Sequence, residues 1–270
     1  MVDELAIISR AVDQYLPSHV FALFSGGHDS LCATHLAAQH PSFTGVVHIN
    51  TGIGIQETRI FVRETCAEHH WPLREYHPDS NFEQMCIEKG FPGPASHRWM
   101  YIKLKERPLC QLIRETADPK DRRRKIVFVH GGRRAESARR KIGLAGEIET
   151  DRKHPSPRVV WVAPIIEWEA EQKRIYMAEH KLRPNLVTET LCMSGECLCG
   201  AFAKPGELAE IRKFYPAAAA EIDRIAALVK DAGQHHIWGT RPGKRKHPDQ
   251  LDLPLCYSCE AKADRASAEE

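Results

Sequence analysis

The sequence predicts an α/β protein with a doubly wound, mostly parallel sheet followed by a small cysteine-rich C-terminal region. Short runs of β-branched and aromatic residues alternate with helix-like segments, which is the pattern of βαβ units. A glycine-rich turn at 25–30, SGGHDS, separates the first such run from the helix after it. With 270 residues, of which 42% are hydrophobic, the chain is long enough to bury a full core. We therefore expect parallel strands whose carboxyl ends meet at one edge, where ligands of such sheets bind.

Each element is placed by its apolar pattern. Strands are expected at 20–24, 45–49, 72–76, 125–130 and 159–164. Helices are expected at 3–15, 29–39, 56–70, 107–117, 169–181, 206–214 and 217–231. The stretch 143–158 contains Gly, Pro, Lys and Asp and is expected to be a loop, and 240–250 is expected to be a basic linker.

Composition and charge limit the function classes. No uninterrupted apolar run of about 18 residues occurs, and the N-terminus has no signal-peptide pattern, so we expect a cytoplasmic protein with no membrane partner. The formal net charge of +2 is too small to indicate nucleic-acid binding by itself. However, ten Lys or Arg residues lie between Lys120 and Lys141, against two acidic residues. This local excess favours a polyanion such as DNA or tRNA as a partner, and a solvated basic loop is the alternative.

The turn at 25–30 has the features of a phosphate-binding loop. Its two glycines lack a Cβ and let the backbone approach an anion, and the following helix presents amides without intrahelical partners. The turn lacks the lysine of a Walker A loop, and its spacing differs from the dinucleotide fingerprint G-x-G-x-x-G. The alternative is an ordinary glycine-rich turn in which Asp29 caps the helix.

The pattern S-G-G-x-D-S after a strand resembles the PP-loop of the ATP pyrophosphatases. This resemblance implies an adenine nucleotide alpha hydrolase-like fold and an enzyme that grips the β- and γ-phosphates of ATP with Mg²⁺. Such enzymes cleave ATP between the α- and β-phosphates. The residues that match the loop are Ser25, Gly26, Gly27, Asp29 and Ser30. Asp29 is expected either to hold Mg²⁺ through water, as a catalytic residue, or to cap the helix.

Three further segments resemble the phosphoadenosine phosphosulfate (PAPS) reductase family, a branch of the PP-loop enzymes. They are NTGIGIQET after the second strand, GGRRAESARR after the fourth, and APIIEW with the helix that follows it. The resemblance spans about residues 18–188. It implies further nucleotide contacts from Thr51, Gly52, Gly131, Arg133 and Ser137.

Arg133 and Arg140 are candidate catalytic residues. Gly131 and Gly132 end a strand and open a basic segment, an arrangement that favours a second anion-binding nest. Guanidinium groups suit phosphate oxygens, so we expect both arginines to neutralise the charge that develops as the α–β bond of ATP breaks. The alternative is an ordinary solvated helix face.

Five of the nine cysteines cluster beyond these motifs. They are Cys192, Cys197 and Cys199 in LCMSGECLCGAF, and Cys256 and Cys259 in PLCYSCEAK. In a cytoplasmic chain, a C-x-C and a C-x-x-C favour a metal centre over disulfides, and thiolate ligands permit both iron–sulfur and zinc. Family resemblance favours a 4Fe–4S cluster, with Zn²⁺, or free or redox-active thiols without a metal, as the alternatives. The expected ligands are Cys197, Cys199, Cys256 and Cys259, while Cys192 is either a substitute ligand or the catalytic thiol that carries or attacks sulfur.

These motifs divide the chain into three parts. We expect a PP-loop nucleotide-binding domain at 1–188, a Cys-rich helical region that binds the metal or cluster at 189–262, and a tail at 263–270.

The sequence also departs from its relatives in ways that bear on function. Its tail lacks the E-C-G-L-H sequence of PAPS reductases, and Met100 and Tyr101 stand where adenylyl-sulfate reductases carry a Cys-Cys pair. We therefore favour an ATP-dependent PAPS reductase-like enzyme that releases pyrophosphate and activates an acceptor, DNA or tRNA, for sulfur transfer. A sulfur donor such as a cysteine desulfurase is then an expected partner. The alternatives are a sulfonucleotide reductase, or a non-catalytic nucleotide-binding subunit of a nucleic-acid modification or defence complex.

Overall fold

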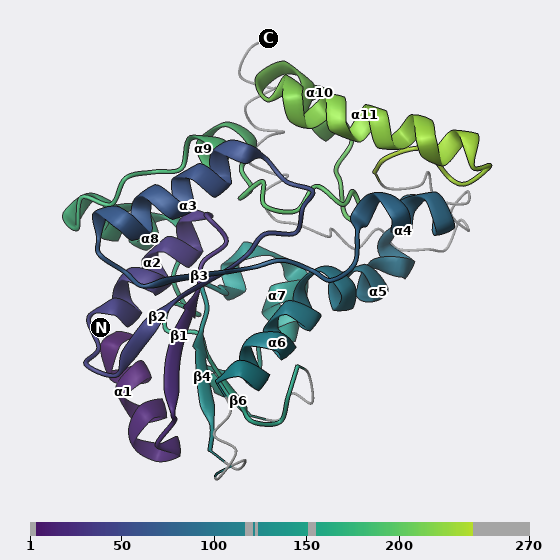
Figure 1. The fold of residues 1–270 in the computed structure, drawn as a ribbon. Coiled ribbons are helices and arrows are strands. Elements are labelled where there is room, and N and C mark those ends of the chain that lie inside the picture. Colours follow the sequence, from purple (N-terminus) through teal and green to yellow (C-terminus); the bar gives the residue numbers. More distant parts are fainter. Residues whose placement is uncertain (1–3, 117–120, 122–123, 151–154, 240–270) are drawn as a thin grey trace, which may run out of the picture.

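The computed structural model describes residues 4–116, 121, 124–150 and 155–239. Its centre is a six-stranded sheet with the strand order β3-β2-β1-β4-β6-β5 (Figure 1). Every neighbouring pair is parallel except β5 and β6, which pair antiparallel. The strands are β1 (His19–Leu23), β2 (Phe43–Ile49), β3 (Leu73–Tyr76), β4 (Ile126–Val129), β5 (Ile148–Glu149) and β6 (Val159–Val162).

Helices connect the strands and form the C-terminal part of the described chain. The first six are α1 (Glu4–Tyr15), α2 (His28–Ala38), α3 (Gln56–Glu68), α4 (Phe82–Lys89), α5 (His97–Tyr101) and α6 (Arg107–Glu115). A π-helical turn, η2 (Ile102–Glu106), joins α5 to α6, and two 3₁₀ turns, η1 (Pro94–Ser96) and η3 (Arg134–Glu136), precede α5 and α7. The others are α7 (Ala138–Gly143), α8 (Ala170–Glu179), α9 (Leu186–Leu191), α10 (Glu207–Phe214) and α11 (Pro216–Asp231).

Burial explains why the central strands read as continuous apolar runs. All four residues of β4 and all four of β6 are buried. In β1 the three inner residues are buried. Parallel strands covered by helices on both faces need apolar side chains on both sides, so their sequences do not alternate.

The two faces of the sheet are covered by different helices. On one face, α1 and α2 pack on the sheet through Ile8, Ala11 and Leu36. On the other face, α6 packs Leu109 and Leu112 against strand residues that include Phe128. The result is a three-layer α/β arrangement, as the sequence predicted.

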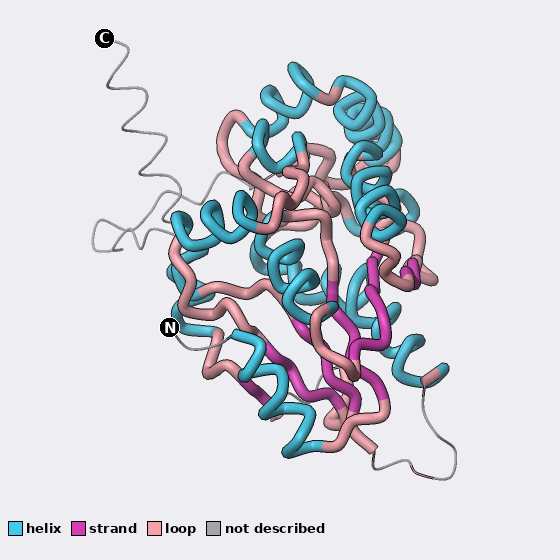
Figure 2. Tube along the Cα trace, turned by 90° about the vertical axis from the view of Figure 1, so that its left-hand side faces the viewer, coloured by secondary structure: helices cyan, strands magenta, loops and turns pink. Residues whose placement is uncertain are grey.

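A separate cluster of buried residues lies beyond the carboxyl ends of the strands. It joins α4, α9, α10 and α11, with Phe91, Leu104, Ile211 and Ile222 among its members. Figures 1 and 2 both show α10 and α11 beyond the end of the sheet rather than on one of its faces. The helices thus add a second core next to the edge of the sheet where ligands are expected.

All five predicted strands and all seven predicted helices are present, with ends that differ by a few residues. The structure corrects the predicted loop at 143–158, because Ile148–Glu149 form β5 against β6. It also adds α4, α5, α7 and α9, which are five to eight residues long. Such short elements carry too few apolar repeats to be recognised by periodicity. The predicted linker at 240–250 and the tail lie outside the described residues.

The expected division of the chain after residue 188 falls within α9, and it stays a prediction. Among the described residues, no helix is both long enough and apolar enough to cross a membrane.

Candidate functional site

The strand order reverses between β1 and β4, and the PP-loop (residues 25–30) leaves the sheet at this point. The Ser25 amide donates to Ser30 Oγ at 3.2 Å, and Ser30 Oγ donates to the Gly27 carbonyl at 2.8 Å. These bonds curl the loop onto the first turn of α2. The N-cap residue is Gly27, which supplies no side-chain cap to the first-turn amides of α2.

Two glycines make the close approaches that this loop needs. Gly26 has φ +81°, and a Cβ there would lie less than 3.0 Å from the Thr58 side chain. A Cβ on Gly131, at the end of β4, would lie less than 3.0 Å from the backbone of Asp29 and Ser30. The two glycine segments singled out in the sequence therefore meet across the switch point, backbone against backbone.

Asp29 lies between two cations. Its Oδ1 is 2.9 Å from Arg133 Nε and 3.1 Å from the Nζ of Lys173 on α8. Arg133 is buried and also donates from Nη1 to the Trp168 carbonyl at 3.0 Å. Asp29 is therefore an ion-pair partner rather than a helix cap in this structure, and the expected contacts of Arg133 and Asp29 with phosphate or Mg²⁺ stay predictions.

Ser137 is the N-cap residue of α7, and Arg140 lies within this helix. The Ser137 hydroxyl caps this helix by accepting from the Arg140 amide at 3.2 Å. The Arg140 guanidinium is 40% exposed and pairs with Glu136 at 3.3 Å. Both side chains thus have local partners, and their expected roles toward a nucleotide stay predictions.

Thr51 and Gly52 follow β2, but Thr51 is occupied by a partner that sequence reasoning missed. The Thr51 amide donates to Glu196 Oε1 at 2.8 Å, and its hydroxyl donates to the Glu196 carbonyl at 2.8 Å. Gly52 is exposed, with φ +80°, and its amide donates to Asn50 Oδ1 at 3.1 Å. A cavity of about 400 Å³ opens beside these residues and extends to Asp79.

The segment 185–194 lies directly on the PP-loop. Asn185 Nδ2 donates to the Gly26 carbonyl at 2.9 Å, and its backbone amide donates to His28 Nε2 at 3.1 Å. A Cβ on Gly27 would lie 3.4 Å from Ser194 Cβ. Burial lowers the pKa of His28 against the opposing pull of Glu189, which favours the neutral ring whose Nε2 accepts from the Asn185 amide.

The cysteine loop (residues 192–199) is fixed to the loop after β2. The Ile55 amide donates to the Gly195 carbonyl at 2.8 Å, and the Leu198 amide donates to the Ile53 carbonyl at 2.7 Å. Between these bonds the buried Glu196 carboxylate faces His48 Nε2 at 3.2 Å.

His48 continues this connection toward the PP-loop. Its Nδ1 donates to the carbonyl of Phe24, the residue before the PP-loop, at 2.8 Å. A buried chain of contacts therefore runs from Phe24 through His48 to Glu196, which is adjacent to Cys197.

The cysteines of this loop have two different environments. Cys197 and Cys199 lie side by side, and the Cys199 thiol, as a hydrogen-bond donor, and the nearby Lys105 ammonium lower the pKa of Cys197. The same interaction raises the pKa of Cys199. Cys192 is exposed and ends α9 in the left-handed conformation, with φ +54°.

Thiolate metal binding fits the adjacent pair Cys197 and Cys199, but Cys256 and Cys259 lie outside the described residues. Within the described ranges, no group of three or more His, Cys, Asp or Glu side chains is arranged to hold a metal ion. The expected ligand set therefore stays a prediction.

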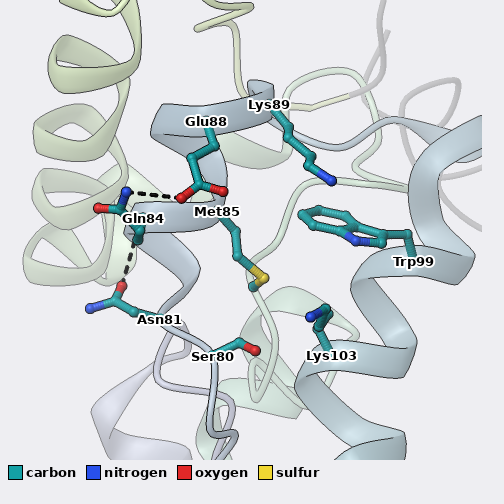
Figure 3. Close-up of a pocket in the computed structure, with 8 residues that line it drawn as sticks. All are labelled: Ser80, Asn81, Gln84, Met85, Glu88, Lys89, Trp99 and Lys103. Carbon is teal, nitrogen blue, oxygen red and sulfur yellow. Dashed lines mark hydrogen bonds between the residues drawn. The ribbon is translucent and has the colours of Figure 1, made fainter.

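A second cavity, of about 270 Å³, opens between α4 and the segment α5–η2 (Figure 3). Lys89 Nζ lies 4.6 Å from the ring centroid of Trp99, and Figure 3 shows the sulfur of Met85 pointing from α4 toward the helical segment that carries Trp99 and Lys103. The full lining is Ser80, Asn81, Gln84, Met85, Glu88, Lys89, Trp99 and Lys103. This cavity was not predicted from the sequence, because most of its lining comes from α4, α5 and η2, which are too short for periodicity to detect.

A doubly wound sheet with a glycine-rich loop at its switch point is typical of nucleotide-binding α/β proteins. The family model of the phosphoadenosine phosphosulfate reductase domain matches residues 19–194. The chain therefore belongs to this family, as its motifs indicated, and is a nucleotide-binding enzyme of that superfamily.

Solved structures that match with a TM-score of 0.50 or above show the same fold. PAPS reductase from Candida auris is 16% identical, with a TM-score of 0.51, over 70% of this chain and 84% of that one. FMN adenylyltransferase from Candida glabrata, solved with ATP, is 13% identical, with a TM-score of 0.50, over 70% of this chain and 56% of that one. The U34-tRNA thiolase NcsA from Methanococcus maripaludis, solved with its [4Fe-4S] cluster, is 16% identical, with a TM-score of 0.46, over 93% of this chain and 84% of that one. No curated protein matches the sequence.

Proposed function

We propose that this protein is an ATP-dependent PAPS reductase-like enzyme that binds ATP with Mg²⁺, releases pyrophosphate and activates an acceptor for sulfur transfer. The observation that carries the proposal is the packing of segment 185–194 on the PP-loop, through Asn185 on Gly26 and Ser194 beside Gly27. This packing brings the start of the cysteine loop to the edge of an anion-binding turn. An enzyme that activates an acceptor and then transfers sulfur to it needs both elements close together.

The first chemical step is attack of an acceptor oxygen on the α-phosphorus of ATP. A new O–P bond forms, the bond to the β-phosphate oxygen breaks, and pyrophosphate leaves with that electron pair. The attacking group loses a proton to solvent. Charge grows on the departing pyrophosphate, and the first-turn amides of α2, aided by Arg133 and Arg140, are proposed to stabilise it.

In the second step Cys192 carries the sulfur as a persulfide, whose outer sulfur attacks the atom that bears the adenylated oxygen, and AMP leaves with the electron pair of the broken bond. A second thiol then attacks the Cys192 sulfur, the S–S bond breaks, and the outer sulfur stays on the acceptor at the oxidation state of sulfide. That thiol and Cys192 end as a disulfide, so the two electrons of this reduction come from the thiols. Cys192 is the proposed carrier of this sulfur, because it is exposed and lies two residues from Ser194, the neighbour of Gly27. A cysteine desulfurase is the proposed class of donor.

The proposed metal ligands are Cys197 and Cys199 together with Cys256 and Cys259. The adjacency of the first two thiols supports this set. A 4Fe–4S cluster, or Zn²⁺ as the alternative, would supply a thiolate-bound cationic centre near the cysteine loop. Within the chain itself, the Cys199 thiol and then the Lys105 ammonium lower the pKa of Cys197, which favours the thiolate form that any such metal requires.

The proposed acceptor is a nucleic acid, DNA or tRNA. The cavity in Figure 3 supports an anionic acceptor, because Lys89 and Lys103 line it beside an aromatic ring. The cavity is also linked to the cysteine loop. Trp99 and Lys103, which line the cavity, lie on the same helical segment as Lys105, and Lys105 interacts electrostatically with Cys197.

The proposal is tested by incubating anaerobically purified protein with ATP labelled at the α- and γ-phosphates, with and without transfer RNA or duplex DNA. Release of both AMP and pyrophosphate that depends on the acceptor is the expected result. Tight ATP binding without either product would instead establish the non-catalytic subunit. Release of sulfite from PAPS or adenylyl sulfate, with a thiol reductant, would establish the sulfonucleotide reductase.

A further inference from the structure

Lys173 is a cation at the PP-loop that no motif indicated. It lies on α8, a helix that packs against α2, and its Nζ is 3.1 Å from Asp29 Oδ1. The same oxygen is 2.9 Å from Arg133 Nε. One carboxylate is thus matched by two cations, which leaves one positive charge in excess. Because this excess lies at the N-terminus of α2, where the helix dipole is also positive, the site favours an anion.

The two cations differ in how firmly they are held. The Arg133 side chain is 7% exposed and is tied to the Trp168 carbonyl by a 3.0 Å hydrogen bond. The Lys173 side chain is 21% exposed, and a lysine carries three rotatable donors on a flexible stem. Within the described residues, neither Asp29 Oδ1 nor Arg133 Nε has a partner with hydrogen-bond geometry, although both are buried. The ion pairs at Asp29 are therefore close but poorly aligned, and Lys173 is the more exposed of the two cations.

We propose that Lys173 is a phosphate-binding residue that leaves Asp29 and donates to the pyrophosphate part of ATP. This inference rests on the proposed function, since it needs a triphosphate in the PP-loop. Lys173 supplies from α8 a positive charge that the PP-loop itself lacks, because no lysine follows the glycines of this loop as one does in a Walker A loop. Asp29 stays neutralised by Arg133 after the exchange, so no buried charge is left unpaired.

The test measures binding of inorganic pyrophosphate to the full chain by calorimetry, with a chelator present to remove any contribution of a metal at Asp29. Lys173→Gln is expected to weaken pyrophosphate binding by about tenfold, the effect of one lost hydrogen bond between charged groups. Arg174→Gln is the matched control. It removes one cation from the same helix, but Arg174 pairs with the exposed Glu171, so its variant is expected to bind like the wild type.

A second pair of variants separates phosphate binding from mere neutralisation of Asp29. If Lys173 only screens the carboxylate, Asp29→Asn restores binding to the Lys173→Gln protein. If Lys173 contacts the phosphate, Lys173→Gln costs the same factor in the Asp29→Asn background as in the wild type. Restoration overturns the inference, and an unchanged cost supports it. Circular dichroism and melting temperature confirm that each variant is folded.

The two proposals fail in different ways. A wild-type protein that binds neither ATP with Mg²⁺ nor pyrophosphate overturns the proposed function and this inference with it. A wild-type protein that binds both, and a Lys173→Gln variant that binds both equally well, overturn only the role of Lys173.

Discussion

The PP-loop and the cysteine loop lie side by side at the end of the sheet, yet they are held by different kinds of contact. The PP-loop is shaped by glycine backbone: Gly26 and Gly131 fit only because they lack a Cβ. The cysteine loop is held instead by a buried side chain, Glu196, which reaches Thr51 and His48. The conformation of a loop that depends on its own backbone can be predicted from a short sequence motif. The conformation of a loop that depends on a side chain distant in the sequence cannot.

The largest effect is expected at Gly131. Gly131→Ala places a Cβ within 3.0 Å of the Asp29 backbone, so the strand end and the start of α2 must separate. We expect a loss of about 3 kcal/mol or more in the free energy of unfolding, and no measurable ATP binding. Gly143→Ala is the control, because a Cβ there meets nothing within 4 Å. Normal ATP binding by Gly131→Ala would show that the two glycine segments do not act together.

The next effect is expected at Glu196. Glu196→Ala leaves the buried Thr51 amide without its hydrogen-bond acceptor and removes the carboxylate that lies 3.2 Å from the buried His48 Nε2, at a cost of about 3 kcal/mol in denaturant unfolding. The exposed Glu179→Ala serves as the control and is expected to change stability by less than about 0.5 kcal/mol. If the two loops are held by separate contacts, the Glu196→Ala protein that remains folded still binds pyrophosphate, while its cysteines become more reactive toward iodoacetamide. Loss of both properties together would mean that the two loops are one unit.

A pH effect is expected on the helix that supports the PP-loop. His35 on α2 bonds to the Tyr176 hydroxyl on α8 at 2.7 Å, and burial, followed by the nearby His180 and His69, lowers the pKa of His35 to about 4. The unfolded chain, with an ordinary pKa near 6.5, takes up this proton first as the pH falls. The contribution of His35 to the free energy of unfolding is therefore fully present above about pH 6.5. It declines toward pH 4, by about 2 kcal/mol after allowing for the partial exposure of the ring.

Chemical denaturation at pH 7 and pH 4.5 measures this decline. His35→Gln is expected to flatten it, and His40→Gln, two residues beyond the end of α2, is expected to leave it unchanged. An equally steep decline in His35→Gln protein would place the acid-sensitive group elsewhere.

The smallest change in stability is expected at Cys192. This residue has φ +54° at the end of α9, a conformation that glycine adopts without strain. Cys192→Gly is therefore expected to change unfolding free energy by no more than about 0.5 kcal/mol, because relief of strain offsets the entropy of glycine. Sulfur transfer is expected to be lost in Cys192→Gly and in the matched Cys192→Ser protein. Retained transfer in either would remove Cys192 from the mechanism and leave Cys197 or Cys199 as the carrier.

How far the sequence leads depends on how local the determining contacts are. The strands β1, β4 and β6 were predicted because complete burial forces continuous apolar runs. The two residues of β5 were missed because a pair so short has no period. Met100 was noted for replacing a cysteine, and its side chain is 1% exposed within the second core, a placement that no motif specified.

The sequence by itself determined the parallel α/β fold, the family and the position of the PP-loop. Each of these follows from neighbouring residues: apolar runs that suit buried strands, and glycines that the backbone needs where it turns. Only the tertiary structure decided that Asn185 grips Gly26, that Glu196 holds Thr51, and that Lys173 reaches Asp29. These partners are separated by more than a hundred residues, and a single polar side chain leaves no local pattern that announces which distant group it will meet.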